Sequence, residues 1–225
     1  MFVELYHALN RGVEKRNIFM DERDFVRFIH DLWEFNDADP TSHAIHSFRN
    51  LDLRNPNFPD NGKKRIVDLH AWCLMKNHYH LLLSECVEGG LVLFLRKLNV
   101  GYANYFNERY KRSGALFQGR TKKVLVHSEA HFLHILHYIH LNPLDYFSGA
   151  KEWRQGHVND PTKAKAYLDR YRWSSYGDYC GRKNFPSIVT TEFFTESIGN
   201  VEKETLAYLG KIHGASDTLP QRFLE

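Results

Sequence analysis

Two histidines separated by one residue are the first candidates for chemistry, in the segment His78-Tyr79-His80. In an extended strand, residues i and i+2 lie on the same face of the sheet, so both imidazoles can reach one metal ion. The apolar run Leu81-Leu82-Leu83 that follows is typical of a strand anchored in a core. Two packed histidines without a metal role give the same pattern. The pair alone leaves both interpretations open.

A tyrosine and an asparagine four residues apart form the second candidate, Tyr138 and Asn142. On a helix this spacing places both side chains on one face. A phenol has a pKa near 10 and becomes a nucleophile when its anion is stabilised. The amide oxygen of Asn142 is a suitable further ligand for a hard divalent ion beside two histidines. The alternative is a core tyrosine with an asparagine that ends the helix before Pro143.

The third candidate is a basic segment between residues 96 and 123, where eight basic residues accompany one acidic residue, Glu108. Aromatic residues are interleaved with them, a pattern typical of surfaces that bind nucleic acid. A solvated helix face gives the same composition. The segment is not a P-loop, because Gly119 is followed by Arg120-Thr121. The basic residues are Arg96, Lys97, Arg109, Lys111, Arg112, Arg120, Lys122 and Lys123.

These residues must be positioned by a mixed set of elements. The apolar patterns predict strands at 2–9, 65–75, 78–85 and 122–126, and helices that begin after Asp21, near Leu91 and after Ser128. This order predicts an α+β fold, a ferredoxin-like (split βαβ) sandwich with an antiparallel sheet, followed by a C-terminal helical extension. In that extension we expect helices at 171–179 and 191–213. The polar stretch 36–64 predicts a long loop, with one short helix near 43–48.

Composition excludes several classes of protein. The chain has 225 residues, 43% of them hydrophobic, and a formal net charge of +3. It lacks an apolar run of membrane-spanning length and a secretory signal at its start. Its three cysteines, Cys73, Cys86 and Cys180, form no C-x-x-C pair, which argues against a disulfide framework or a zinc ribbon. We therefore expect a cytoplasmic protein with no membrane partner.

The motifs, taken together and in order, resemble those of the HUH single-tyrosine transposases, in particular the branch of REP-associated tyrosine transposases. The resemblance covers roughly residues 2–179. It rests on Tyr6-His7 with Asn10-Arg11-Gly12, the run from Leu74 to Leu83, Gly114 to Arg120, Tyr138 to Pro143, and Tyr171 to Tyr176. Two departures from the family pattern are Lys76, where a proline is frequent, and a longer insertion at 36–64.

The resemblance implies a metal-dependent enzyme that cleaves and rejoins single-stranded DNA near a palindromic hairpin, through a 5′-phosphotyrosine. It implies Tyr138 as the nucleophile and His78, His80 and Asn142 as ligands of Mg²⁺ or Mn²⁺. We expect the DNA surface to contain Arg11 and the eight basic residues of the segment above. The resemblance also implies a bacterial protein that acts at the nucleoid, as a monomer or a homodimer. We expect a catalytic domain at 1–147, with its insertion at about 36–64, and the extension at 148–225.

Two other functions fit parts of the pattern. One is a module that binds hairpin DNA or RNA without cutting it. The other is an HUH nickase of the replication or conjugation type, which often has a second tyrosine one helical turn from the first. Here the positions four residues from Tyr138 hold His134 and Asn142, which favours the single-tyrosine interpretation. A zinc hydrolase built on His78 and His80 would lack an evident acidic ligand in the same hairpin.

Overall fold

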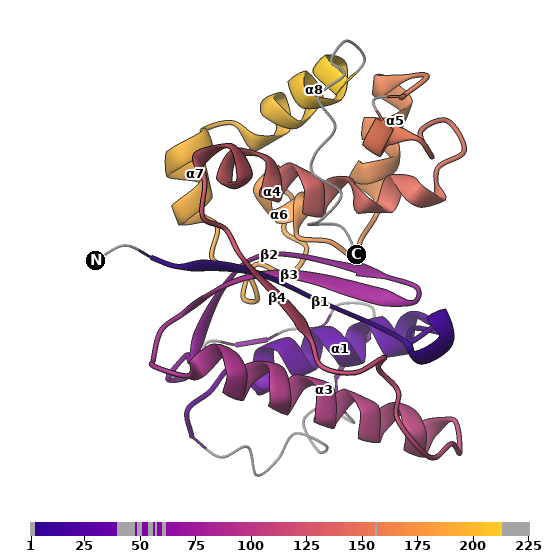
Figure 1. Ribbon diagram of the computed structural model, residues 1–225, viewed down its shortest axis with the longest axis vertical. Coiled ribbons are helices and arrows are strands. Elements are labelled where there is room, and N and C mark those ends of the chain that lie inside the picture. The colour runs from indigo at the N-terminus through magenta and orange to yellow at the C-terminus, as the bar shows by residue number, and fades with distance from the viewer. Residues whose placement is uncertain are drawn as a thin grey trace.

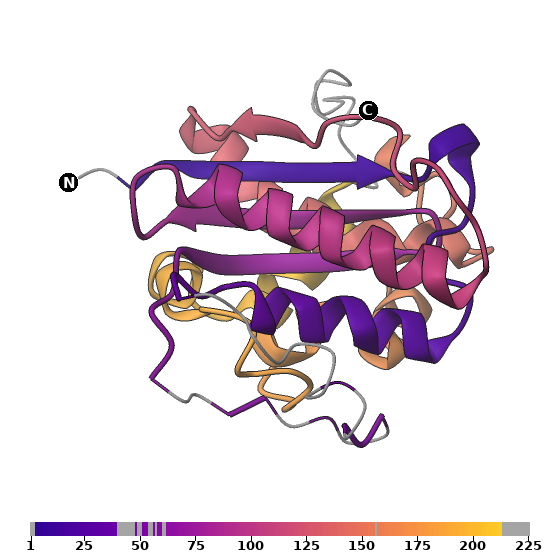
Figure 2. The same ribbon diagram turned by 90° about the horizontal axis from the view of Figure 1, so that it is seen from below.

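A four-stranded antiparallel sheet separates two layers of helices (Figures 1 and 2). The computed structural model describes residues 3–39, 48, 51–53, 56, 58–59, 62–155 and 157–212. The strands are β1 (Leu5–Arg11), β2 (Val67–Met75), β3 (His78–Glu85) and β4 (Lys122–Leu125), in the order β2-β3-β1-β4. Both neighbours of β1, and both strands of the β2–β3 hairpin, run antiparallel. Residues 76–77 form the tight turn between β2 and β3.

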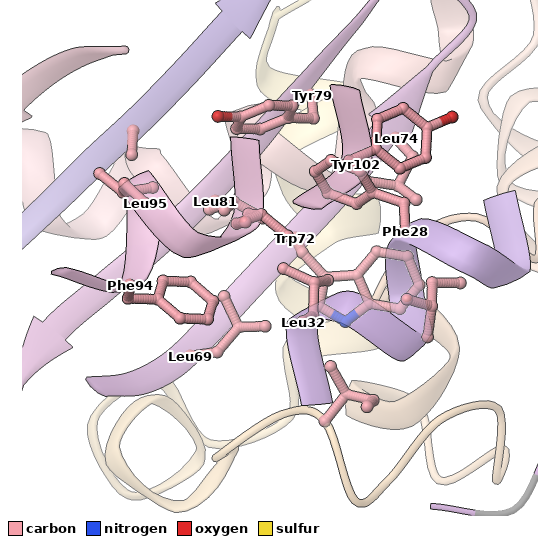
Figure 3. Packing of buried hydrophobic residues seen from close by; sticks show 14 of the residues in the cluster. Phe28, Leu32, Leu69, Trp72, Leu74, Tyr79, Leu81, Phe94, Leu95 and Tyr102 are labelled. Carbon is pink, nitrogen blue, oxygen red and sulfur yellow. The ribbon is translucent and has the colours of Figure 1, made fainter. Parts of the chain in front are cut away.

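Two long helices cover one face of the sheet. They are α1 (Glu22–Glu34) and α3 (Gly90–Arg109). As predicted, α1 begins after Asp21, whose side chain accepts a hydrogen bond from the backbone N–H of Asp24 and so satisfies one unpaired donor of the first turn. Buried side chains of both helices pack against the sheet around Trp72, as Figure 3 shows.

The other face of the sheet carries the helices that follow β4, with α4 (Glu129–Leu141) against the sheet. Ser128 caps α4 by accepting from the backbone N–H of His131. Two short 3₁₀ helices follow, Asn142–Tyr146 and Trp153–Gln155. The remaining helices are α5 (Pro161–Arg170), α6 (Tyr176–Tyr179), α7 (Glu192–Ile198) and α8 (Val201–Ile212). A second buried cluster joins residues from β2, α4 and these later helices.

The element order confirms the predicted α+β fold with an antiparallel sheet and C-terminal helices. Among the described residues, no helix combines the length and the apolar character needed to span a bilayer. The expected short helix at 43–48 lies outside the described residues apart from Phe48, as does residue 213 of the last expected helix.

Several predicted boundaries were wrong, and the smaller differences are that β1 begins at Leu5, β2 begins at Val67 and β4 ends at Leu125. Strand β1 continues to Arg11, because it pairs there with His78. Only 176–179 of the expected helix 171–179 is helical, because the residues before it run along β2. There the backbone N–H of Leu74 donates to Trp173, and that of Ser175 donates to Trp72. The helix expected at 191–213 is two helices, α7 and α8, separated by Gly199-Asn200, with Gly199 at a φ of 78°.

We predict that acid loosens the contact between α4 and α8 through His137. This buried imidazole contacts Thr205 and stacks on Tyr208 of α8, and burial lowers its pKa to about 4. The unfolded chain takes up the proton near pH 6.5, so the stability that the neutral ring contributes is complete above that pH and is lost as pH falls toward 4. Between pH 7 and pH 5 this loss is about 2 kcal/mol.

Urea unfolding at both pH values measures the difference. In His137→Phe the fall in unfolding free energy between pH 7 and pH 5 should be smaller by that amount. The exposed His157 provides a control, and His157→Phe should leave the pH dependence unchanged. Equal pH dependence in wild type and His137→Phe would contradict the prediction.

Candidate active site

The two histidines of β3 face the layer that contains α4. The alternate residues of β3, Tyr79, Leu81 and Leu83, pack in the core under α1 and α3. His80 is buried and His78 is half-buried, and their ring centroids lie 5.0 Å apart. The strand thus places both imidazoles side by side on one face, as the spacing predicts.

A third histidine, His7 of β1, completes this group. Its ring stacks on His80 at a centroid distance of 5.2 Å, and its Nε2 lies 2.9 Å from Nδ1 of His80. His7 belongs to the motif Tyr6-His7, but sequence reasoning gave it no role. The pairing of β1 with β3 in register Leu9↔His80 is what brings it near, and this register cannot be read from a single strand.

The hydrogen bonds leave a ring nitrogen of each β3 histidine available. Asn77 donates through its amide to Lys15 O, so its oxygen accepts from Nδ1–H of His78, 2.6 Å away. Nε2 of His78 therefore carries a lone pair. In the described part of the chain, buried Nε2 of His80 has no hydrogen-bond partner. When Nδ1–H of His80 donates to His7, Nε2 of His80 also carries a lone pair.

Burial keeps these rings neutral. It lowers the pKa of His7 to about 3 and that of His78 to about 4, and it lowers the pKa of His80 well below its usual value. The nearby charges of Arg11 and Arg154 act in the same direction on His78 and His80. Neutral imidazole is the form that binds metal ions.

Helix α4 brings Tyr138 to the histidines. The Tyr138 ring is buried and lies edge-on to His80 and to His7, with centroid distances of 5.8 and 5.9 Å. Burial raises the pKa of its phenol, while the charge of Arg154 and a hydrogen bond from it lower that pKa. A phenol beside a guanidinium and two metal-ligand candidates is suited to nucleophilic chemistry.

Asn142 lies one turn beyond Tyr138, but its oxygen already has a partner. Its amide N–H donates to Tyr138 O at 2.8 Å, and its Oδ1 accepts from Nη2 of Arg154 at 2.6 Å. Arg154 also pairs with Asp145 and packs over Trp153. Nothing in the sequence pattern indicated Arg154, because it follows a polar stretch and reaches the site through a tertiary contact.

The donor set fits a divalent ion in part. Two neutral imidazole nitrogens, Nε2 of His78 and Nε2 of His80, belong to rings on the same side of the sheet. Buried Nε2 of His80 has no hydrogen-bond partner among the described residues. In the described residues, however, no three His, Cys, Asp or Glu side chains gather as a complete set of ligands. A further ligand must therefore come from Asn142, from a bound phosphate or from water.

The predicted DNA-binding residues divide between two faces. Arg11 is the cross-strand partner of His78, and Lys122 is the partner of Leu9, which pairs with His80, so both lie on the histidine face. Lys123 alternates to the other face, and Arg120 is exposed before β4. Residues from α3 and its C-terminal loop lie on the side away from the histidines: Arg96, Lys97, Arg109, Lys111 and Arg112.

Several residues of that second group are bound within the protein. Arg109 pairs with Asp21 and with buried Asp24. Lys97 donates to Asp37 O, and Arg112 donates to Asn107. These contacts hold α3, its C-terminal loop and the neighbouring segments together. Arg11 and Lys122 are therefore the basic residues best placed to contact a ligand at the histidines.

The similarity of this chain to known proteins lies in its structure. No protein-family model matches the sequence, and no curated protein matches it. A solved structure described as a REP-associated tyrosine transposase bound to a REP hairpin is similar to this chain, with a TM-score of 0.45 and 12% sequence identity. The match covers 84% of this chain and 85% of that one. That protein is of the family whose motifs this sequence resembles.

Proposed function

We propose that this protein cleaves and rejoins single-stranded DNA beside a hairpin, with Tyr138 as the nucleophile. The observation that carries the proposal is the approach of the Tyr138 ring, from α4, to neutral His80, which lies beside His78 on β3. The motifs that hold these groups resemble those of REP-associated tyrosine transposases, which is the reason for choosing a palindromic hairpin as the substrate.

His78 and His80 would hold Mg²⁺ or Mn²⁺ through their Nε2 atoms. The bound ion would supply Lewis-acid stabilisation of the charge that develops on the phosphate. Imidazole ligands carry no charge, so the ion keeps its full charge toward DNA. Asn142 is the candidate third ligand once its oxygen is released by Arg154.

The protein residues would perform the transfer as follows. Tyr138 Oη attacks the phosphorus in line, forming the Tyr–O–P bond while the bond from phosphorus to the 3′ oxygen breaks. The phenolic proton is balanced by the proton gained by the leaving 3′-hydroxyl, so no water is consumed. The phosphotyrosine conserves one ester bond for another, and a new 3′-hydroxyl can reverse the step. Arg11 and Lys122 would hold the strand by its phosphates.

The nucleophile is tested by Tyr138→Phe. The protein is incubated with Mn²⁺ and single strands of the palindromic repeats that flank its gene, and then run on a denaturing gel. Wild type should form a covalent protein–DNA adduct, and Tyr138→Phe should form none while it still binds the hairpin. Tyr146 ends the 3₁₀ helix that follows α4, and its hydroxyl accepts from Lys76 N–H, so Tyr146→Phe is the matched control and should keep the adduct. An adduct in Tyr138→Phe that maps to another tyrosine would refute the assignment, and binding without any adduct in wild type would favour a non-cutting module.

The histidine pair is tested by His80→Ala. This change removes one ring nitrogen from the proposed ion and should abolish adduct formation, because the phosphate then loses its charge stabilisation. Hairpin affinity measured in EDTA should stay close to that of wild type in EDTA, since without the ion it depends on phosphate contacts and the fold. EDTA should have the same effect on wild type, whereas exposed His157→Ala should behave as wild type. Adduct formation at the normal rate in EDTA would remove the ion from the mechanism.

The basic face is tested by salt dependence. The double variant Arg11→Ala/Lys122→Ala should bind single strands more weakly, and its plot of log affinity against log salt should be shallower by up to about 1.4, at about 0.7 for each phosphate that the variant no longer neutralises. Fluorescence anisotropy over a NaCl series gives the slope. Arg96→Ala changes an exposed arginine of α3 and should leave the slope unaltered. A weaker slope in Arg96→Ala together with an unchanged one in the double variant would place DNA on the α3 side.

A further inference from the structure

Arg154 contacts several groups at and just after the end of α4. Its Nη2 donates to Asn142 Oδ1 at 2.6 Å, and its Nη1 pairs with Asp145. Its guanidinium carbon lies 5.7 Å from the centre of the Tyr138 ring and 4.4 Å from that of Trp153. The guanidinium therefore lies within a few ångströms of both the proposed nucleophile and a proposed metal ligand.

Asn142 Oδ1 cannot accept a hydrogen bond from Arg154 and coordinate a divalent ion at the same time. The amide is fixed, because its N–H groups face the backbone oxygens of α4 and its oxygen faces Arg154. An ion at that oxygen would stand beside the guanidinium, and two like charges a few ångströms apart repel strongly in a buried site. One of the two cations must therefore leave the oxygen when the other arrives.

Asp145 provides an anchor about which Arg154 can turn. The carboxylate of Asp145 also accepts from Nε1 of the buried Trp153, at 2.8 Å, so it is fixed independently of Asn142. Arg154 can lose the bond to Asn142 and keep the ion pair. Its freed donors would then face a phosphate at Tyr138, for which the planar guanidinium is well suited.

The charge around the histidines favours an ion that arrives with a phosphate. The charges of Arg11 and Arg154 act on both His78 and His80, and Asp145 is the acidic group that acts on His78. Without a phosphate, a divalent ion at the histidines would have neutral ligands and would be surrounded by a net positive charge. A phosphodiester reverses that balance, because it supplies negative charge to the ion and to the guanidinium together.

We propose that Arg154 couples the divalent ion to the phosphodiester: it occupies Asn142 Oδ1 in the absence of the ion and moves to the phosphate when the ion binds. This proposal rests on the proposed function for the identity of the site. It adds that the ion and the phosphate each favour the binding of the other. The ion binds weakly alone and tightly with phosphate, and by thermodynamic linkage the phosphate gains equally from the ion.

The test measures Mn²⁺ affinity of the full chain by electron paramagnetic resonance of the free ion, with and without dimethyl phosphate as a minimal phosphodiester. Wild type should bind Mn²⁺ more tightly when dimethyl phosphate is present. Arg154→Met should bind Mn²⁺ alone about fivefold or more tightly than wild type, because Asn142 is released, and should gain less from dimethyl phosphate than wild type does. The double variant His78→Ala/His80→Ala should lose the Mn²⁺ site in all cases.

Two further variants separate this role from a structural one. Arg182 also pairs with a carboxylate, Asp169, and packs over an aromatic ring, Tyr176, so Arg182→Met should leave Mn²⁺ binding unchanged. Arg154→Lys can still pair with Asp145, but its single ammonium lacks the fork that reaches Asn142 at the same time, so it should bind Mn²⁺ alone more tightly than wild type and retain more of the phosphate effect than Arg154→Met. Thermal melting identifies any variant that fails to fold, and Arg154→Lys then replaces Arg154→Met as the deciding variant.

Equal or weaker Mn²⁺ affinity in folded Arg154→Met, or in Arg154→Lys where it is the deciding variant, would overturn the coupling. Failure of the coupling and failure of the proposed function are distinguishable, because the DNA adduct is scored separately. An adduct in wild type without any change of Mn²⁺ affinity in the variants would reject only the role of Arg154. Tighter Mn²⁺ binding in Arg154→Met without an adduct in wild type would support the coupling and reject DNA cleavage.

Discussion

The hydrogen bond between His7 and His80 is the contact on which the geometry of the site depends. Both rings are buried and neutral, so they share one hydrogen between Nε2 of His7 and Nδ1 of His80. The direction of that bond decides which outer nitrogen carries a lone pair. When His80 donates, its Nε2 faces outward as a ligand and His7 keeps its hydrogen on Nδ1. An ion at His80 selects this arrangement, and His7 in turn fixes the orientation of the ring that holds the ion.

The C-terminal helices determine where the tyrosine stands relative to that pair. Ser175 is central to this, because its hydroxyl contacts both the backbone of Trp72 in β2 and Nε2 of His140 in α4. Tyr171 and Tyr179 donate to backbone oxygens of Leu74 and His70, farther along the same strand. Residues 171–179 thus hold the edge strand β2 and helix α4 together.

Much of the site could be predicted from short patterns. The i, i+2 spacing placed His78 and His80 on one face, and the caps and apolar periods located β3 and α4. His7 and Arg154 were missed for different reasons. His7 reaches its partner only through the register of β1 on β3, and Arg154 only through the fold of the chain after α4. Both contacts form only in the folded chain, and the local spacing of residues carries no information about them.

The basic segment illustrates a second limit of sequence reasoning. Charge counted along the chain combines residues that alternate across β4 with residues on the opposite side of the molecule. Arg109 contributes to the count, yet its guanidinium is committed to Asp21 and to the buried carboxylate of Asp24. Local net charge predicts a nucleic-acid surface only when charged residues that are paired within the protein are left out of the count.

A site of neutral ligands with an arginine that can change partners would suit the proposed transfer, which must run in both directions. The tyrosyl ester and the original phosphodiester have the same charge, so a protein that stabilised one strongly would trap the reaction there. At this site the histidines and Tyr138 are uncharged, and all but half-buried His78 are buried, while the positive charge is carried by Arg11 and Arg154. In the proposed reaction, charge that follows the phosphate would stabilise the transition state in either direction without binding one ester in preference to the other. The burial that keeps the imidazoles neutral and the ion pair with Asp145 that would hold Arg154 when it leaves Asn142 would then serve the same chemical requirement.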